Sequence, residues 1–171
     1  MSEINTCVCF SHGKESGPWG TKIKHMAKVA KELGFAVESI DYQGISDPDA
    51  RVDKLLHWYA GFSGRVILVG SSMGAYVAAA AAEKLPINGL FLLAPAVTIP
   101  GFGKITNPQI NTAKSAIIHG WQDEIIPVSL IIDFARKQNI TLHLLPGDHS
   151  LIGVLPSVLE IFSAFLKNQQ S

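Results

Sequence analysis

The most restrictive feature of this 171-residue chain is a series of short apolar runs that alternate with helical patterns. Six runs have the length and apolar composition of β-strands, at residues 4–10, 35–42, 65–70, 89–96, 115–120 and 141–147. Helical patterns lie between or after them, at residues 17–34, 47–61, 75–85, 127–138 and 157–168. Apolar strands joined by helical crossovers are typical of a parallel sheet buried on both faces. The sequence therefore predicts an α/β fold with a doubly wound, mostly parallel sheet of about six strands and helices on both faces.

One long segment breaks the alternation. Residues 97–114 lie between the fourth and fifth predicted strands and are rich in proline, glycine and asparagine, so we expect a loop there. No internal repeat, linker or low-complexity stretch divides the chain, and its length suits one domain with its own core. We therefore expect residues 1–171 to form a single domain.

Charge and cysteine content argue against several classes of protein. Fourteen basic side chains balance fourteen acidic ones, and no basic stripe suggests a nucleic-acid partner. Cys7 and Cys9 fall on one face of one predicted strand, which is a poor geometry for a disulfide. Two buried thiols in a reducing compartment are therefore expected, and with only His12 nearby they are too few to hold a metal ion.

The uncharged run at residues 66–82 raises the question of a membrane span. It is at the short limit for crossing a bilayer and carries two serines and two glycines near its centre. The first ten residues lack the basic and long apolar regions of a signal peptide. We therefore predict a cytoplasmic protein without a membrane span.

The centre of that run, "GSSMG" at residues 70–74, has the pattern G-x-S-x-G between a predicted strand and a predicted helix. A serine there occupies the tight turn known as the nucleophile elbow, at the strand end where α/β sheets bind ligands. The same residues could serve only as a turn, but their place in the chain favours a reactive Ser72. The N–H of Met73 at the following helix would then face a developing oxyanion.

A nucleophilic serine needs a base and an orienting carboxylate. Of the six histidines, His149 in "GDHSL" is best placed, because it follows the last predicted strand. Asp123 in "HGWQDEIIP" follows the strand before it, and the order serine, aspartate, histidine matches that of α/β-hydrolases. Glu124 and Asp148 compete for the acid role, but a helix-end charge and a capping role, respectively, are expected of them.

The loop after the first predicted strand, "FSHGKESGPWG" at residues 10–20, lies where a second oxyanion donor is expected. The backbone N–H of either Gly13 or Lys14 would supply it, with His12 ordering the loop. We expect His119, at the end of another strand, to be packed or hydrogen-bonded near the site.

Together, "SHGKES", "GSSMG", "HGWQDEIIP" and "GDHSL" resemble the α/β-hydrolase superfamily, and in particular its small lidless bacterial, esterase-like serine hydrolases. The resemblance covers nearly the whole chain. It implies a nucleophile, a base, an acid and an oxyanion hole formed by Ser72, His149, Asp123, and the N–H groups of Met73 with Gly13 or Lys14. It implies no metal and no cofactor. The family's first two strands are missing here, and its cap is reduced to residues 97–114.

These expectations define a serine hydrolase acting on a carboxylic ester or thioester through an acyl-enzyme. Without a cap, the acyl group should be small or presented on a carrier molecule, and Trp19, Ile99 and Phe102 are candidates for an apolar rim. The alternatives are a non-catalytic binding protein on a hydrolase scaffold and a small peptidase.

Overall fold

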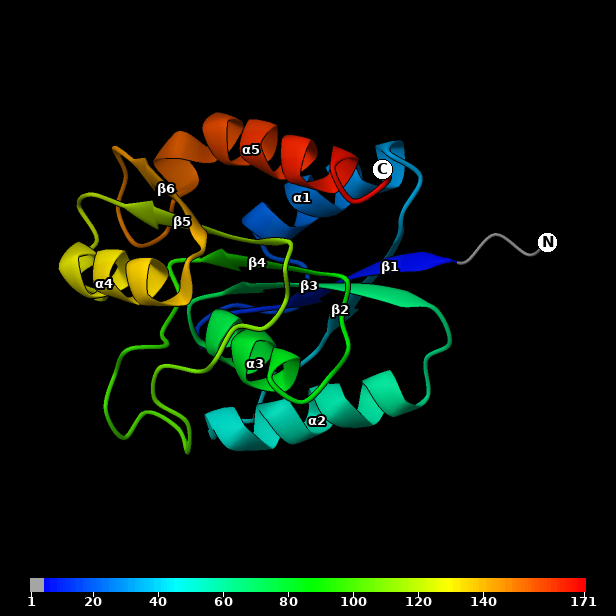
Figure 1. The fold of residues 1–171 in the computed structure, drawn as a ribbon, viewed down its shortest axis with the longest axis horizontal. Coiled ribbons are helices and arrows are strands. Elements are labelled where there is room, and N and C mark those ends of the chain that lie inside the picture. Colours follow the sequence, from blue (N-terminus) through cyan, green and yellow to red (C-terminus); the bar gives the residue numbers. More distant parts are fainter. Residues whose placement is uncertain (1–4) are drawn as a thin grey trace.

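A six-stranded sheet forms the middle layer of the protein (Figure 1). The computed structural model describes residues 5–171, and every strand pairing in it is parallel, in the order β2-β1-β3-β4-β5-β6. The strands are β1 (Thr6–Ser11), β2 (Ala36–Ile40), β3 (Arg65–Ser71), β4 (Gly89–Leu93), β5 (Ser115–Gly120) and β6 (Thr141–Leu145). The six predicted strands and the parallel sheet are therefore confirmed, although Ile4 of the first predicted strand lies outside the described residues.

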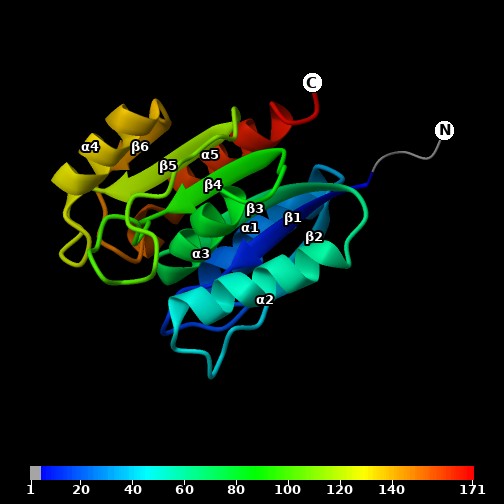
Figure 2. The same ribbon diagram turned by 60° about the horizontal axis from the view of Figure 1, so that its bottom comes forward.

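Within residues 5–171, five α-helices cover the two faces of the sheet, as expected of a doubly wound fold (Figures 1 and 2). One face carries α1 (Thr21–Glu32) and α5 (Leu155–Lys167), with a short 3-10 helix, η1 (Ile152–Val154), just before α5. The other face carries α2 (Pro48–Ala60), α3 (Met73–Ala82) and α4 (Val128–Gln138). Asp47 caps α2 as its sequence suggests, accepting a hydrogen bond of 3.0 Å from the N–H of Asp49.

The strands build two cores because their side chains alternate between the faces. Within β3, Ile67 and Val69 pack in the core under α1 and α5, whereas Val66 and Leu68 pack in the core under α2, α3 and α4. All ten residues of α3 are buried, and its alanines let it lie close to the sheet. The uncharged run at 66–82 is thus a central strand and a buried helix. Within residues 5–171, no helix is long and apolar enough to cross a membrane.

Residues 97–114 contain neither helix nor strand, as predicted. This loop is fastened to α2 and α3 by hydrogen bonds and an aromatic contact. Tyr76 Oη donates to Asp49 at 2.8 Å, and the N–H of Lys104 donates to the same carboxylate at 3.0 Å. The ring of Phe102 packs edge-on against Tyr76, and a Cβ at Gly103 would collide with the Tyr76 hydroxyl. The fold therefore has no cap domain.

Cys7 and Cys9 are buried free thiols on β1, as their spacing suggests. Burial raises the pKa of the Cys7 thiol to about 12, so this sulfur stays protonated and unreactive at neutral pH.

Candidate active site

The turn from β3 to α3 holds Ser72 in an unusual backbone conformation. Its φ of 55° and ψ of −116° lie in a region that L-residues rarely adopt. The glycines on either side make the turn possible. A Cβ at Gly70 would collide with the carbonyl of Gly74, and a Cβ at Gly74 would collide with the carbonyl of Ser11 on β1. The G-x-S-x-G pattern is therefore required by close contacts and presents the serine hydroxyl at the carboxyl edge of the sheet.

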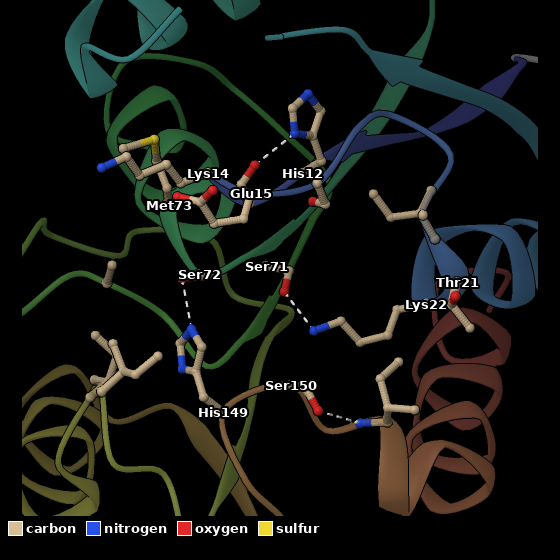
Figure 3. A pocket seen from close by; sticks show the side chains of 18 of the residues that line it. His12, Lys14, Glu15, Thr21, Lys22, Ser71, Ser72, Met73, His149 and Ser150 are labelled. Carbon is tan, nitrogen blue, oxygen red and sulfur yellow. Dashed lines mark hydrogen bonds between the residues drawn. The ribbon is translucent and has the colours of Figure 1, made fainter.

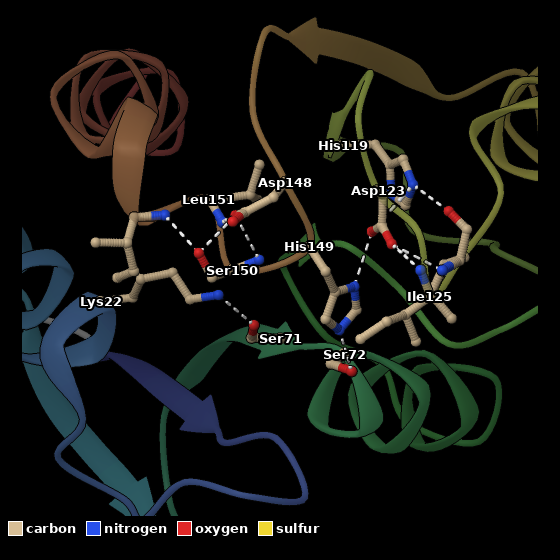
Figure 4. Close-up of polar contacts among 12 residues, drawn as sticks. Lys22, Ser71, Ser72, His119, Asp123, Ile125, Asp148, His149, Ser150 and Leu151 are labelled. Carbon is tan, nitrogen blue, oxygen red and sulfur yellow. Dashed lines mark hydrogen bonds and ion pairs between the residues drawn. The ribbon is translucent and has the colours of Figure 1, made fainter.

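The three residues that the sequence singles out form a hydrogen-bonded chain (Figure 4). His149 Nε2 lies 2.9 Å from Ser72 Oγ, and His149 Nδ1 lies 2.7 Å from Asp123 Oδ2. An ionised carboxylate accepts only, so Nδ1–H donates to Asp123 and Nε2 is left to accept from the serine hydroxyl. This arrangement can remove the hydroxyl proton as the oxygen attacks an electrophile.

Backbone donors hold the Asp123 carboxylate in place. Its Oδ1 accepts hydrogen bonds from the N–H groups of Ile125 at 2.9 Å and Ile126 at 2.7 Å, and the residue is only 8% exposed. His119 is fully buried behind it, with Nε2 donating to the carbonyl of Ile126 at 2.9 Å and lying 3.4 Å from Asp123 Oδ2. Burial lowers the pKa of His119, so this ring is neutral at pH 7. The expectation that His119 is packed and hydrogen-bonded near the site is therefore confirmed.

The loops after β5 and β6 bind each other, which brings acid and base together. The N–H of Trp121 donates to the carbonyl of Leu145 at 2.9 Å, and the N–H of Gln122 donates to that of Gly147 at 3.0 Å. A Cβ at Gly120 would collide with the Gly147 carbonyl. Because β5 and β6 are neighbours in the sheet, the loops that follow them lie side by side. Asp123 and His149 are therefore in contact although they are 26 residues apart in sequence.

Asp148 and Glu124, the competing acids, do not contact His149 through a hydrogen bond in the described part of the chain. Asp148 Oδ1 accepts from the N–H groups of Ser150 and Leu151 and from the Ser150 hydroxyl, which makes it the cap of its own turn. These hydrogen bonds, led by the Ser150 hydroxyl, lower the pKa of Asp148. Glu124 is exposed.

His12 orders the loop after β1, as expected. The N–H of Tyr42 donates to His12 Nε2 at 2.8 Å, so the ring proton is on Nδ1, which donates to the carbonyl of Gly13 at 2.7 Å. Arg51 Nη1 donates to the carbonyls of His12 at 3.2 Å and Gly13 at 3.3 Å. Because C=O and N–H point in opposite directions across a trans peptide, the N–H groups of Gly13 and Lys14 point away from Arg51.

Arg51 is a residue whose role the sequence does not reveal. Its side chain is 2% exposed, and its Nε donates to the carbonyl of Ile45 at 2.7 Å. The guanidinium lies 5.4 Å from the ring centre of Tyr42, and no carboxylate of residues 5–171 pairs with it. The loop after β1 is therefore held by a buried cation reaching across from α2.

A cavity of about 580 Å³ opens beside Ser72 (Figure 3). Its wall includes all the residues proposed for the oxyanion hole, namely Gly13, Lys14 and Met73. Among residues 5–171, no hydrogen bond between backbone groups uses the N–H of any of these three, so the groups remain free for a ligand. The cavity volume is in the range of small-molecule sites.

The predicted apolar rim is only partly assembled at this cavity. Ile99 and Phe102 line it, whereas Trp19 is 44% exposed and does not. Ile125 and Ile152, at 65% and 44% exposed, line it instead, although nothing in the sequence distinguishes them from ordinary core residues. Most of the wall is apolar, as is usual for a site that binds small organic molecules.

Lys22 also lines the cavity, although nothing in the sequence predicts a lysine there. Its Nζ donates to Ser71 Oγ at 2.9 Å, one residue before the elbow serine (Figures 3 and 4). Burial lowers the pKa of Lys22 to about 8, although the Asp148 and Asp123 carboxylates act against the shift. Within residues 5–171, no group of three or more His, Cys, Asp or Glu side chains is arranged to hold a metal ion.

Comparison with known proteins places this geometry in a family. The family model described as "Alpha/beta hydrolase family" matches residues 9–155, which is most of the chain. The chain belongs to this family. No curated protein matches the sequence.

Solved structures share the fold over nearly the whole length. A protein of the alpha/beta hydrolase superfamily from Xanthomonas campestris pv. campestris is 28% identical, with a TM-score of 0.85, covering 96% of this chain and 98% of its own. Est1E from Butyrivibrio proteoclasticus is 21% identical, with a TM-score of 0.81, covering 99% of this chain and 89% of its own. A lidless α/β serine hydrolase from Xanthomonas campestris is 22% identical, with a TM-score of 0.80, covering 96% and 82%. The chain thus shares its fold with hydrolases, one of which is described as having no lid.

Proposed function

We propose that this protein is a serine hydrolase that cleaves a carboxylic ester or thioester through an acyl-enzyme on Ser72. The observation that carries the proposal is the hydrogen-bonded chain from Ser72 through His149 to Asp123, set on a strained elbow beside a cavity. Acyl transfer by a serine requires that the nucleophile, the base and the acid are aligned in this way. The strained elbow exposes the serine hydroxyl for attack.

In the first half-reaction, Ser72 Oγ attacks the substrate carbonyl carbon while His149 Nε2 takes the hydroxyl proton. Asp123 holds the imidazole in the correct tautomer and stabilises the imidazolium that forms. The N–H groups of Met73 and of Gly13 or Lys14 bind the negative oxygen of the tetrahedral intermediate, with each donor contributing about 3 kcal/mol. Collapse of the intermediate breaks the bond to the leaving alcohol or thiol, which takes the proton back from His149.

In the second half-reaction, water attacks the acyl-enzyme in the same way. His149 takes a proton from the water, the intermediate collapses, and the proton returns to Ser72 Oγ as the carboxylic acid leaves. The loop at Gly13 and Lys14 supports oxyanion binding in both half-reactions. Arg51 and His12 both donate to the Gly13 carbonyl, so the N–H of Lys14 in the same peptide points away from Arg51.

The cavity volume and the fastened 97–114 loop favour small acyl groups or an acyl group carried on a larger molecule. Ile99 and Phe102 contribute apolar surface for the acyl chain. Est1E, which shares the fold at 19% identity to this chain, is bound to ferulic acid in one of its structures.

The test is the rate of hydrolysis of p-nitrophenyl butyrate together with labelling by a fluorophosphonate. Wild-type protein should hydrolyse the ester and gain one adduct, located on the peptide that contains Ser72. Ser72→Ala should abolish both, whereas Ser63→Ala, an exposed serine at the other end of β3, should change neither. A folded wild-type protein that takes no label and hydrolyses no ester would instead be a binding protein on a hydrolase scaffold.

A further inference from the structure

A partly buried ammonium lies near the nucleophile. Lys22 is partly buried in the first turn of α1, lines the cavity, and donates one hydrogen bond, to Ser71 Oγ. An ammonium group has three donor hydrogens, so two remain for a ligand. No carboxylate of residues 5–171 lies within ion-pair distance of it.

Two features of this position oppose a positive charge. Burial disfavours the ammonium, which is why the pKa of Lys22 falls to about 8. The N-terminal end of a helix repels cations, and the first turn of α1 holds no acidic residue to offset Lys22. The Asp148 and Asp123 carboxylates favour the charge, but neither lies within ion-pair distance of Lys22, and Asp148 accepts the hydrogen bonds of its own turn. A neutral side chain of similar length would serve packing better, which points to a role in binding.

The cavity wall combines polar and apolar residues. In Figure 3, Lys22, Thr21 and Ser71 lie on one side of the pair formed by Ser72 and His149. The apolar residues of the wall are Ile23, Met73, Ala96, Ile99, Phe102, Ile125, Ile126 and Ile152. The exposed rim residues Lys14 and Glu15 are adjacent in sequence and opposite in charge, so they add little net field. Among the wall residues, Lys22 thus places an uncompensated positive charge beside the serine.

We propose that Lys22 binds a carboxylate of the substrate, so that the preferred substrates are esters or thioesters that carry a negative charge a few carbon atoms from the scissile carbonyl. The inference rests on the proposed hydrolase function and names its substrate class. The carboxylate can belong to the acyl part or to the leaving alcohol, and the experiment below has one arm for each.

Matched ester pairs measure the preference. Monoethyl glutarate against ethyl pentanoate places the carboxylate on the acyl part, and 4-acetoxybutanoate against butyl acetate places it on the alcohol, with hydrolysis followed by pH-stat titration. In one of the two arms, kcat/KM for the anionic ester should exceed that for the neutral ester by about tenfold or more, because a hydrogen-bonded charge pair gains roughly that much.

Variants of Lys22 decide whether the lysine is responsible. Lys22→Met should lower the ratio of anionic to neutral kcat/KM to about one, and Lys22→Arg should keep a ratio above one. Lys24→Met, at an exposed position two residues along α1, should keep the wild-type ratio. The wild-type ratio should also fall as the pH rises through about 8, where Lys22 loses its proton. An equal ratio in wild-type and Lys22→Met protein, or no preference in either arm, overturns the proposal.

Binding without turnover separates this inference from the hydrolase function. Monoethyl glutarate and 4-acetoxybutanoate are titrated into Ser72→Ala protein by calorimetry, and into the double variant that also carries Lys22→Met. The double variant should bind the preferred ester about tenfold more weakly. If both variants bind both esters with the same affinity, the role of Lys22 is refuted. If the double variant binds the preferred ester more weakly but wild-type protein hydrolyses no ester, only the acyl-transfer step is refuted.

Discussion

Replacing Arg51 with methionine tests whether a buried cation positions the proposed oxyanion loop. Arg51 donates to three carbonyls, those of His12, Gly13 and Ile45, and it does so from α2 rather than from the loop itself. Methionine keeps the apolar stem and fills part of the space, but it cannot donate to any of them.

The structure sets the size of the effect. Complete loss of one oxyanion donor lowers kcat by about 10²- to 10³-fold in serine hydrolases. In Arg51→Met the Gly13 carbonyl keeps its hydrogen bond from His12 Nδ1, so the loop is loosened rather than released. We therefore expect kcat to fall by about 10- to 100-fold with KM changed little, because the oxyanion forms only in the transition state.

Stability should fall as well. Hydrogen bonds to a charged group contribute about 1.5–3 kcal/mol each, but the cost of burying the guanidinium disappears with it, so a net loss of about 3 kcal/mol is expected. For a chain of this length, that loss lowers Tm by roughly 6–12 °C.

The assay is p-nitrophenyl butyrate hydrolysis at 25 °C, with the folded fraction checked by circular dichroism. Arg51→Lys keeps the charge but not the fork of donors, so its kcat should lie between those of wild type and Arg51→Met. A folded Arg51→Met protein with kcat within threefold of wild type would show that the loop holds its shape without the arginine and would refute the reasoning.

Three further changes have outcomes that follow from the described contacts. Asp123→Asn should lower kcat by about 10³- to 10⁴-fold in ester hydrolysis with little change in Tm, since an amide favours the wrong imidazole tautomer; a loss below tenfold would contradict the proposed acid. Gly74→Ala should yield unfolded or insoluble protein, because its Cβ meets the Ser11 carbonyl, and a native circular dichroism spectrum with wild-type Tm would contradict the close contact. The free energy of unfolding, from urea titrations, should fall as the pH drops below about 6.5. The reason is that burial lowers the pKa of His12, His119 and His143 in the folded state, so the unfolded chain binds more protons than the folded one in this pH range. A free energy of unfolding that does not change between pH 7 and pH 5 would contradict this reasoning.

The parallel sheet explains why so much of the site could be predicted from the sequence. Ser72, Asp123 and His149 each follow an apolar strand, and in such a sheet the carboxyl ends of all strands lie along one edge. Their hydrogen bonds then need only the correct strand order, which places β3, β5 and β6 within reach of one another. Short motifs with fixed positions relative to strands are therefore informative.

Lys22 and Arg51 could not be predicted for the opposite reason. Both lie on helices, at positions where the sequence looks like an ordinary solvated face, and both contact residues far away along the chain. Lys22 reaches Ser71, 49 residues on, and Arg51 reaches Gly13, 38 residues back. Helical periodicity shows which side of a helix is apolar, but not where a long polar side chain at the helix end points.

Trp19 illustrates a related limit. It lies in the loop after β1, where the sequence suggested a wall residue, yet it is 44% exposed and does not line the cavity. Isoleucines from the loop after β5 and from η1 line it instead. Composition identifies apolar residues near a site but not which of them face it.

The position of β6 at the edge of the sheet also affects which part of the protein unfolds first on heating. β6 pairs only with β5 among the described strands, and four of its five residues are half-buried while the fifth is exposed, so it has the thinnest cover of the six. Edge elements with little burial open locally at lower free energy than central strands such as β3. His149 follows this strand, whereas Ser72 follows a central one. Gradual warming should therefore detach the histidine from an otherwise intact molecule, and amide hydrogens of β6 should exchange with solvent well before those of β3.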